Sequence, residues 1–257
     1  MEQMLEKMRK LNWLLQKGGE GNIPFDQLTE ILSELMSSNA YVITDKGKII
    51  GVYYANKEDQ PVKKYNKQGE SYILQETNDR FMELTETCLN ITGKEAEAMF
   101  PYDTKAFGKY MMVIPAYGGG RRLGTVLFAR YEKFETEDVI LGEYGAVVVG
   151  IDIDRRRNRE TELMVRKRAM VQLAISTLTS NEIIAMQDVF SRMVSDEGLV
   201  VESKVVDHTG VTRTVVSSGL KKLEVAGVIE SKALGMKGTH IRVVNDELRT
   251  ELSRIKY

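Results

Sequence analysis

The sequence is poor in cysteine and proline, and it has no long hydrophobic run. Its one cysteine, Cys88, excludes an intramolecular disulfide and any metal site built from several thiolates, and it suits a reducing compartment such as the cytoplasm. No apolar stretch approaches the roughly 20 residues that span a bilayer. The sequence therefore predicts a cytoplasmic protein without a metal site and without a membrane partner.

An excess of positive charge is also missing from the chain as a whole. Lysine and arginine total 36, against 37 for aspartate and glutamate, so a nucleic-acid surface would require local segregation of charge. The segment 201–244 shows such segregation, with seven lysines and arginines against four acids. The 257 residues exceed the roughly 100–150 at which single domains are commonest, which favours two domains.

The N-terminal half combines helix and strand patterns. Apolar residues spaced three and four apart predict amphipathic helices over 4–15 and 25–37. Two pairs of β-rich runs, over 40–55 and 110–132, have turn residues between them and predict antiparallel hairpins. Between the hairpins the pattern is irregular, with one helix predicted over 79–87. This half of the chain is therefore predicted to be an α+β domain.

A long connecting helix is predicted next. No proline occurs from 135 to 179, and apolar residues recur there at helical spacing. The middle of this segment, 154–160, is polar on all sides, as in a helix that crosses solvent between domains. Ser180 is predicted to cap the helix that follows. We therefore predict a first domain over 1–154, a connecting helix over 135–180 and a second domain over 181–257.

The second domain has the element order of a winged helix-turn-helix: helix, short extended segment, helix, turn, helix and two strands. Val205 and Val206 give the first helix of the pair an apolar face, and Gly210 supplies a turn residue that tolerates positive φ. Thr212 is predicted to cap the next helix. The apolar residues of that helix are predicted to face the core: Val215, Val216, Leu220 and Leu223.

The polar side of the same helix is predicted to read DNA. A recognition helix contacts base edges mainly through its N-terminal residues, which here are Arg213, Thr214 and Ser217. Lysines suit phosphates, and the wing turn 235–238, with two glycines and one lysine, can follow the DNA backbone. The predicted DNA-binding residues are Ser203, Lys204, Thr212, Arg213, Thr214, Ser217, Ser218, Lys221, Lys222, Lys237, Thr239 and His240.

Two other classes of function remain open. A winged helix can dock a protein instead of DNA, because a fold does not determine a function. An enzyme with a C-terminal interaction module is disfavoured, since the sequence has no Ser-His-Asp set, metal-ligand cluster or Walker A phosphate loop. The sequence predicts a DNA-binding transcription regulator that is not an enzyme.

Three segments resemble the CodY family of nutrient-responsive transcription regulators: TLTSNEIIAMQDVF at 177–190, the block at 197–243, and GGGRRLGTVLFARY at 118–131 followed by EDVILGEYGAVVVG at 137–150. The resemblance implies an N-terminal GAF domain, a long connecting helix and a winged helix-turn-helix in a homodimer. It further implies a global regulator, mainly a repressor of nutrient-limitation and stationary-phase genes. Its effectors would be a branched-chain amino acid (isoleucine, leucine or valine) and GTP.

The resemblance also implies a pocket for the branched-chain amino acid, for which the alternative is an ordinary core. The family's carboxylate-binding arginine is missing, because this sequence reads Gln60-Pro61-Val62-Lys63-Lys64. Lys63, Lys64 or Arg80 could supply the charge, although lysine lacks the bidentate fork of arginine. The predicted ligand-binding residues are Ile73, Leu74, Ala98, Phe100, Pro101, Tyr102, Lys63 and Arg80.

For GTP, the resemblance points to the turn of the first hairpin. The family's Ser-Arg-Arg-Gly-Lys turn reads Thr44-Asp45-Lys46-Gly47-Lys48 here, so an acid replaces one arginine. The residues implied for a phosphate site are Thr44, Lys46, Lys48 and Arg157, helped by Arg156 and Arg159.

Overall fold

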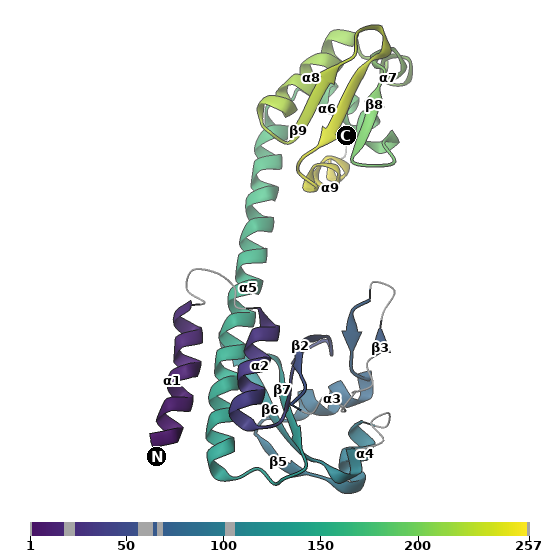
Figure 1. Cartoon of the computed structure of the whole chain (residues 1–257). Helices are drawn as coiled ribbons and strands as arrows, with labels where there is room; N and C mark the ends of the chain where they lie inside the picture. The colour runs from purple at the N-terminus through teal and green to yellow at the C-terminus, as the bar shows by residue number, and fades with distance from the viewer. Residues whose placement is uncertain (1, 18–23, 56–63, 66–68, 101–105, 256–257) are drawn as a thin grey trace. The chain divides into compact units, whose positions relative to one another are not determined.

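The architecture comes from a computed structural model of the chain (Figure 1). The structure describes all residues except 1, 18–23, 56–63, 66–68, 101–105 and 256–257. Contacts divide the chain into two compact units, Met1–Asn158 and Arg159–Tyr257. Within the described residues, no helix is long and apolar enough to cross a membrane.

A five-stranded antiparallel sheet organises the N-terminal unit, in the order β2-β1-β7-β6-β5. Both predicted hairpins are confirmed. The inner strands β1, β6 and β7 are buried on both faces because helices cover the two sides of the sheet, which explains their nearly continuous apolar sequences. The strands are β1 (Asn39–Thr44), β2 (Ile49–Tyr53), β5 (Cys88–Ile91), β6 (Tyr110–Gly118) and β7 (Arg121–Arg130).

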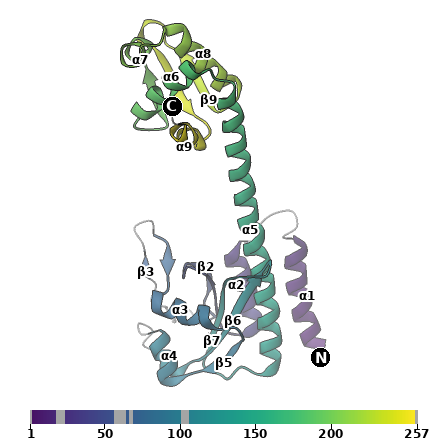
Figure 2. The ribbon, with the colours of Figure 1, turned by 180° about the vertical axis from the view of Figure 1, so that it is seen from behind.

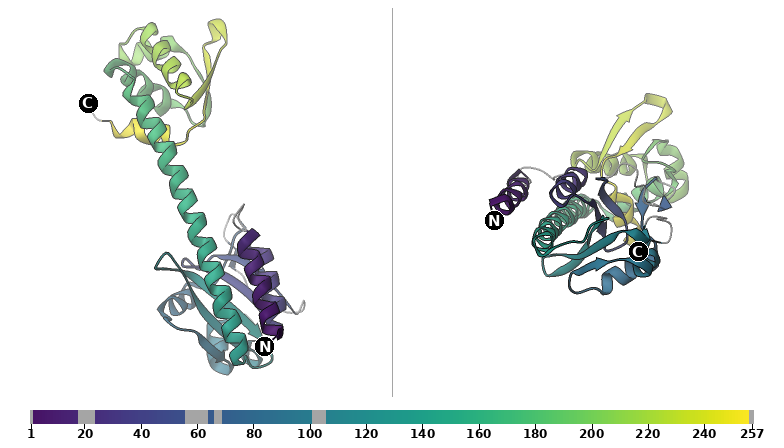
Figure 3. Two further views of the ribbon diagram at one scale, coloured as in Figure 1. Left: turned by 90° about the vertical axis from the view of Figure 1, so that its left-hand side faces the viewer. Right: turned by 60° about the horizontal axis from the view of Figure 1, so that its bottom comes forward.

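Different helices cover the two faces of this sheet (Figure 2). On one face, α1 (Glu2–Lys17), α2 (Phe25–Met36) and the first half of α5 (Thr136–Ser176) enclose a core that includes Leu32, Phe128 and Val148. The end-on view in Figure 3 shows α2 and α5 beside each other against the sheet. On the other face, α3 (Gln75–Glu83) and α4 (Gly93–Met99) cover a second core around Phe81.

The described residues between the hairpins include more helices and strands than their sequence pattern suggests. Instead of a helix over 79–87, α3 runs over Gln75–Glu83. Two of its buried side chains are polar, so they leave no apolar periodicity: the Thr77 hydroxyl donates to the Met99 carbonyl (2.8 Å), and Asn78 Nδ2 donates to the Asp45 carbonyl (2.9 Å). The short strands β3 (Lys64–Tyr65) and β4 (Ser71–Tyr72) and the 3₁₀ turn η1 (Ala106–Gly108) also lie here.

The predicted connecting helix is present as α5, one helix of 41 residues over Thr136–Ser176. Its first half packs so closely on β6 that position 150 requires glycine. A Cβ on Gly150 would lie 2.0 Å from the Tyr117 carbonyl oxygen, well inside van der Waals contact. The boundary between the two units, at Asn158 and Arg159, falls within the polar segment 154–160.

The C-terminal unit is a winged helix-turn-helix, as predicted, with α7 and α8 as the helix pair. Its sheet has the order β8-β10-β9, so the short extended segment before α7 is a third strand of the wing. The core includes Val205, Leu220 and Ile241. The elements are α6 (Ser180–Arg192), β8 (Glu197–Val200), α7 (Glu202–Thr209), α8 (Arg213–Val225), β9 (Ile229–Ala233), η2 (Gly235–Lys237), β10 (Thr239–Val243) and α9 (Glu247–Arg254).

The prediction that Ser180 caps α6 is wrong, because the N-cap residue is Thr179. The Thr179 hydroxyl accepts from the Glu182 N–H, and Glu182 Oε2 accepts from the Thr179 N–H (2.7 Å). This reciprocal pair is a capping box, which satisfies two backbone donors at the start of the helix.

Candidate nucleic-acid interface and ligand site

The turn between α7 and α8 has the geometry that its sequence predicts. Gly210 ends α7 in the left-handed region (φ 71°), where a glycine avoids the strain of a side chain. Val205 and Val211 are buried on either side of it. Thr212 occupies the N-cap position of α8, but the predicted cap is wrong in one respect, because its side chain makes no capping hydrogen bond. The Val215 N–H donates to the Thr212 carbonyl instead (3.0 Å), and the N-terminal end of α8 keeps the partial positive charge that favours an anionic partner.

Helix α8 separates its apolar and polar sides as predicted. Val216, Leu220 and Leu223 are buried in the domain core. Five polar residues of α8 are exposed: Arg213, Thr214, Ser217, Lys221 and, in the last turn, Glu224. Among the described residues, Arg213 and Lys221 form no ion pair with an acid of the chain. This side of α8 therefore presents hydrogen-bond donors and uncompensated positive charge.

The other predicted contacts lie on the neighbouring elements. In α7, Lys204 is exposed and Ser203 is half-buried. Ser217 of α8 donates to Glu202 Oε1 of α7 (2.9 Å), which joins the two helices across the turn. On the wing, Lys237 is exposed at the tip, with Thr239 and His240 half-buried on β10. The structure thus brings the first turn of α8, the start of α7 and the wing into one domain.

Two of the predicted DNA contacts lie on the inner side of α8. Ser218 Oγ donates to Glu182 Oε1, and Lys222 Nζ donates to Glu182 Oε2, both at 2.7 Å. Burial alone would raise the pKa of the Glu182 carboxyl, but the hydrogen bonds from Lys222, Ser218 and Thr179 lower its pKa to about 2. Ser218 and Lys222 therefore hold α8 against α6, a role that the sequence analysis did not find.

We expect Glu182→Gln to lower the free energy of unfolding by about 2–3 kcal/mol at pH 7, because a carboxylate with a depressed pKa stabilises the folded state. That contribution is complete above about pH 4.5 and disappears as the pH falls toward 2. Urea unfolding at pH 7 and at steps down to pH 3 measures it. The exposed Glu197→Gln is the control. An equal difference between wild type and variant at every pH would contradict this role of Glu182.

The predicted amino-acid pocket maps to the second core of the N-terminal unit. Ile73 and Phe100 both pack against this core, and the ring centroids of Phe100 and Phe81 are 6.1 Å apart. Leu74 is half-buried at the N-cap of α3, whereas Ala98 and Arg80 are exposed. Lys63, Pro101 and Tyr102 lie outside the described residues. Two of the predicted lining residues, Ile73 and Phe100, therefore pack against the same core, whereas Arg80 is exposed on α3.

At the first hairpin, the residues implied for GTP are close together but largely engaged within the chain. The Thr44 hydroxyl accepts from the N–H groups of Lys46 (3.3 Å) and Lys48 (3.1 Å). Lys48 Nζ forms an ion pair with Glu70, and Arg157 Nη2 lies 2.6 Å from Asp45 Oδ1. Two of the cations implied for phosphate, Lys48 and Arg157, are thus already paired with carboxylates of the chain. The described residues contain no cluster of three or more metal-ligand side chains.

Comparison with known proteins identifies the family. A model described as the CodY GAF-like domain matches residues 3–177, and one described as the CodY helix-turn-helix domain matches 196–256. The chain belongs to the CodY family. The global transcriptional regulator CodY of Caldanaerobacter subterraneus subsp. tengcongensis is 43% identical over 254 residues, covering 98% of each chain. That of Thermoanaerobacter sp. is 40% identical over 257 residues and covers both chains completely.

Among solved structures, the cofactor-binding GAF domain of the nutrient sensor CodY from Clostridium difficile is 34% identical to this chain. It covers 58% of this chain and 96% of that domain, with a TM-score of 0.48. As a member of the CodY family, the chain is a DNA-binding transcription regulator and not an enzyme. Its N-terminal unit is a GAF domain, and its C-terminal unit is the DNA-binding domain.

Proposed function

We propose that this CodY-family regulator acts in the cytoplasm as a homodimer, mainly as a repressor of nutrient-limitation and stationary-phase genes. The observation that supports DNA reading best is the exposed side of α8, where Arg213 and Lys221 have no acidic partner among the described residues. Arg213, Thr214 and Ser217 contact bases, while Lys204, Lys221 and Lys237 contact phosphates. Ser203, Thr212, Thr239 and His240 flank this surface.

The proposed effector is isoleucine, leucine or valine, bound in the GAF domain beside Phe100 and Ile73. A branched aliphatic side chain gains roughly 1.5–3 kcal/mol on leaving water for such an apolar site. The carboxylate needs a cation, for which Lys63 stays a prediction. A ligand shifts the DNA-binding state only through a difference in its affinity for the two states.

Duplex binding with and without effector tests this proposal. Fluorescence anisotropy of a duplex that carries a selected binding site gives Kd at fixed salt, which is essential because phosphate contacts make affinity steeply salt-dependent. We expect each branched-chain amino acid to lower Kd, with glycine as the control that lacks the apolar side chain. Equal Kd values without effector, with each branched-chain amino acid and with glycine would contradict the proposed effector but not the proposed DNA binding.

GTP stays a prediction from the resemblance, and the ion pair between Asp45 and Arg157 makes it testable. We expect Asp45→Asn to increase the effect of GTP on duplex affinity, because it removes a carboxylate that competes with phosphate for Arg157. Asp154→Asn is the matched control, since it breaks the ion pair with Arg121 at the other hairpin. Titration of GTP at fixed salt measures the effect. If GTP changed the duplex affinity of the native chain as much as that of Asp45→Asn, Asp45 would not compete with phosphate for Arg157.

A further inference from the structure

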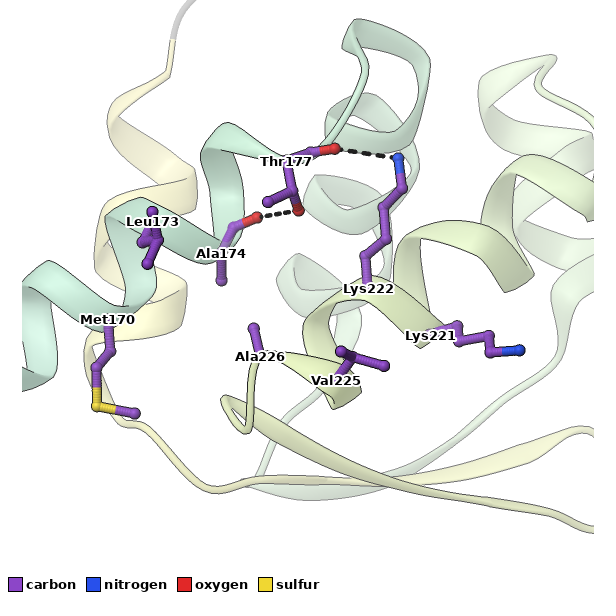
Figure 4. Close-up of a pocket in the computed structure, with 8 residues that line it drawn as sticks. All are labelled: Met170, Leu173, Ala174, Thr177, Lys221, Lys222, Val225 and Ala226. Carbon is purple, nitrogen blue, oxygen red and sulfur yellow. Dashed lines mark hydrogen bonds between the residues drawn. The ribbon is translucent and has the colours of Figure 1, made fainter.

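An apolar groove remains open in the C-terminal unit, between the last turns of α5 and the end of α8 (Figure 4). Met170 and Leu173 line it from α5, and Val225 and Ala226 line it from α8. Leu173 is 70% exposed and Val225 is 81% exposed. Ala226 packs against the core of this domain, but Leu173 and Val225 are not members of that core, so core packing does not explain their apolar character.

The exposed side of α5 has the spacing of a helix that pairs with another helix. Leu163, Arg166, Met170 and Leu173 follow one another at steps of three, four and three, and Thr177 comes four residues later, just past the end of α5. These are the a and d positions of two heptads, and all five residues are exposed. Arg166 is the one charged member, and its long aliphatic stem can cover apolar surface while the guanidinium stays in water. A second helix with the same spacing would fit this stripe.

The charges beside the stripe favour a parallel second copy of the same helix. With Leu163 at position a, Glu162 stands at g and Lys167 at the following e. In a parallel pair of helices, g of one chain lies beside the following e of the other, so Glu162 would meet the partner subunit's Lys167 twice around the two-fold axis. Their present partners, Arg166 for Glu162 and Asp246 for Lys167, form exposed pairs of the kind that contributes little.

We propose that a second copy of this chain packs in parallel along residues 163–176 of α5, with Val225 and Ala226 at the edge of the contact. This inference rests on the homodimer of the proposed function and adds a surface to it. The groove lies at the C-terminal end of α8, whose 13 residues put Arg213 about 18 Å away. Pairing at the groove therefore leaves Arg213, Thr214 and Ser217 uncovered in both subunits, whereas Lys221 lines the groove and would lie at the edge of the contact.

A cysteine cross-link tests the surface directly. In a Cys88→Ser background, Leu173→Cys places thiols across the two-fold axis, where a d position allows the Cα separation of about 4.4–6.8 Å that a disulfide needs. Val165→Cys is the matched control, because Val165 is an apolar residue of the same helix, 60% exposed, that lies off the stripe. We expect mild oxidation to cross-link Leu173→Cys nearly completely and Val165→Cys little. Equal cross-linking of the two, or none at position 173, would overturn the proposal.

A charge exchange provides the second test. Glu162→Lys and Lys167→Glu should each raise the dimer dissociation constant several-fold, and the double variant should restore it, because the exchanged pair meets again across the interface. The pairs within one chain cannot explain a rescue, since the double variant puts a lysine beside Arg166 and a glutamate beside Asp246. Failure of the rescue would overturn the parallel arrangement. Sedimentation of the native chain distinguishes failure of the homodimer from failure of this contact surface. A monomeric native chain would contradict the homodimer. A dimeric native chain whose Leu173→Cys variant does not cross-link would contradict only the contact along α5.

Discussion

Replacing Arg213 with glutamate is expected to weaken duplex binding by at least about 100-fold. A good bidentate contact to a base edge contributes roughly 1–3 kcal/mol, and charge reversal adds repulsion from the phosphates. Both subunits of a dimer would carry the change. Because Arg213 is exposed and forms no ion pair among the described residues, the fold should be unaffected. Anisotropy titration at one salt concentration measures the loss, and circular dichroism checks the fold.

Arg9→Glu is the matched control for this experiment. It makes the same change in net charge on an exposed residue of α1, in the GAF domain. We expect it to leave Kd within about twofold, because Arg9 belongs to the GAF domain and not to the DNA-binding domain. If Arg213→Glu also left Kd unchanged, the polar side of α8 would not be the reading surface, and a protein-docking role for the winged helix would be favoured.

Replacing Phe100 with alanine is expected to raise the isoleucine concentration needed for half of the DNA-binding response by at least about tenfold. The ring packs against the second core of the GAF domain beside Phe81, where the ligand's side chain is proposed to lie. Loss of about 1.5–3 kcal/mol of apolar contact corresponds to a factor of about 10 to 150. Titration of isoleucine at a fixed duplex concentration measures the shift.

The control is Phe107→Ala, which removes a ring that is 59% exposed in the same domain. It should not shift the isoleucine response, and neither variant should change duplex affinity without isoleucine. Thermal unfolding shows whether Phe100→Ala only destabilises the domain. A variant of unchanged melting temperature that still responds to isoleucine like the native chain would place the ligand elsewhere.

Much of the fold could be predicted from local sequence patterns, because the spacing of apolar residues within a helix or strand indicates which of its faces is buried. The buried faces of α8 and the turn at Gly210 follow from apolar spacing and from the need for positive φ. The position and the length of α3 could not be predicted in this way. Its buried residues Thr77 and Asn78 are polar, and they donate hydrogen bonds to carbonyl groups that are distant in the sequence. A polar residue whose partner is remote in sequence carries no periodic signal.

The candidate site shows the same division. Exposure of Arg213, Thr214 and Ser217 follows from their place opposite the valines and leucines of α8. The inward role of Ser218 and Lys222 depends on Glu182, more than 30 residues earlier, which only the packing of α6 on α8 brings near. One signal was available: the Thr179-x-x-Glu182 capping box marks Glu182 as a residue at the start of α6.

The central claim is that the first turn of α8 lies in a major groove, and a tethered cleavage reagent tests it most directly. In a Cys88→Ser background, a DNA-cleaving reagent is attached at Thr214→Cys in α8 or, as control, at Ser253→Cys in α9. We predict cleavage at defined positions inside the bound site from residue 214 and none from residue 253. Full duplex binding without localised cleavage from residue 214 would contradict this account.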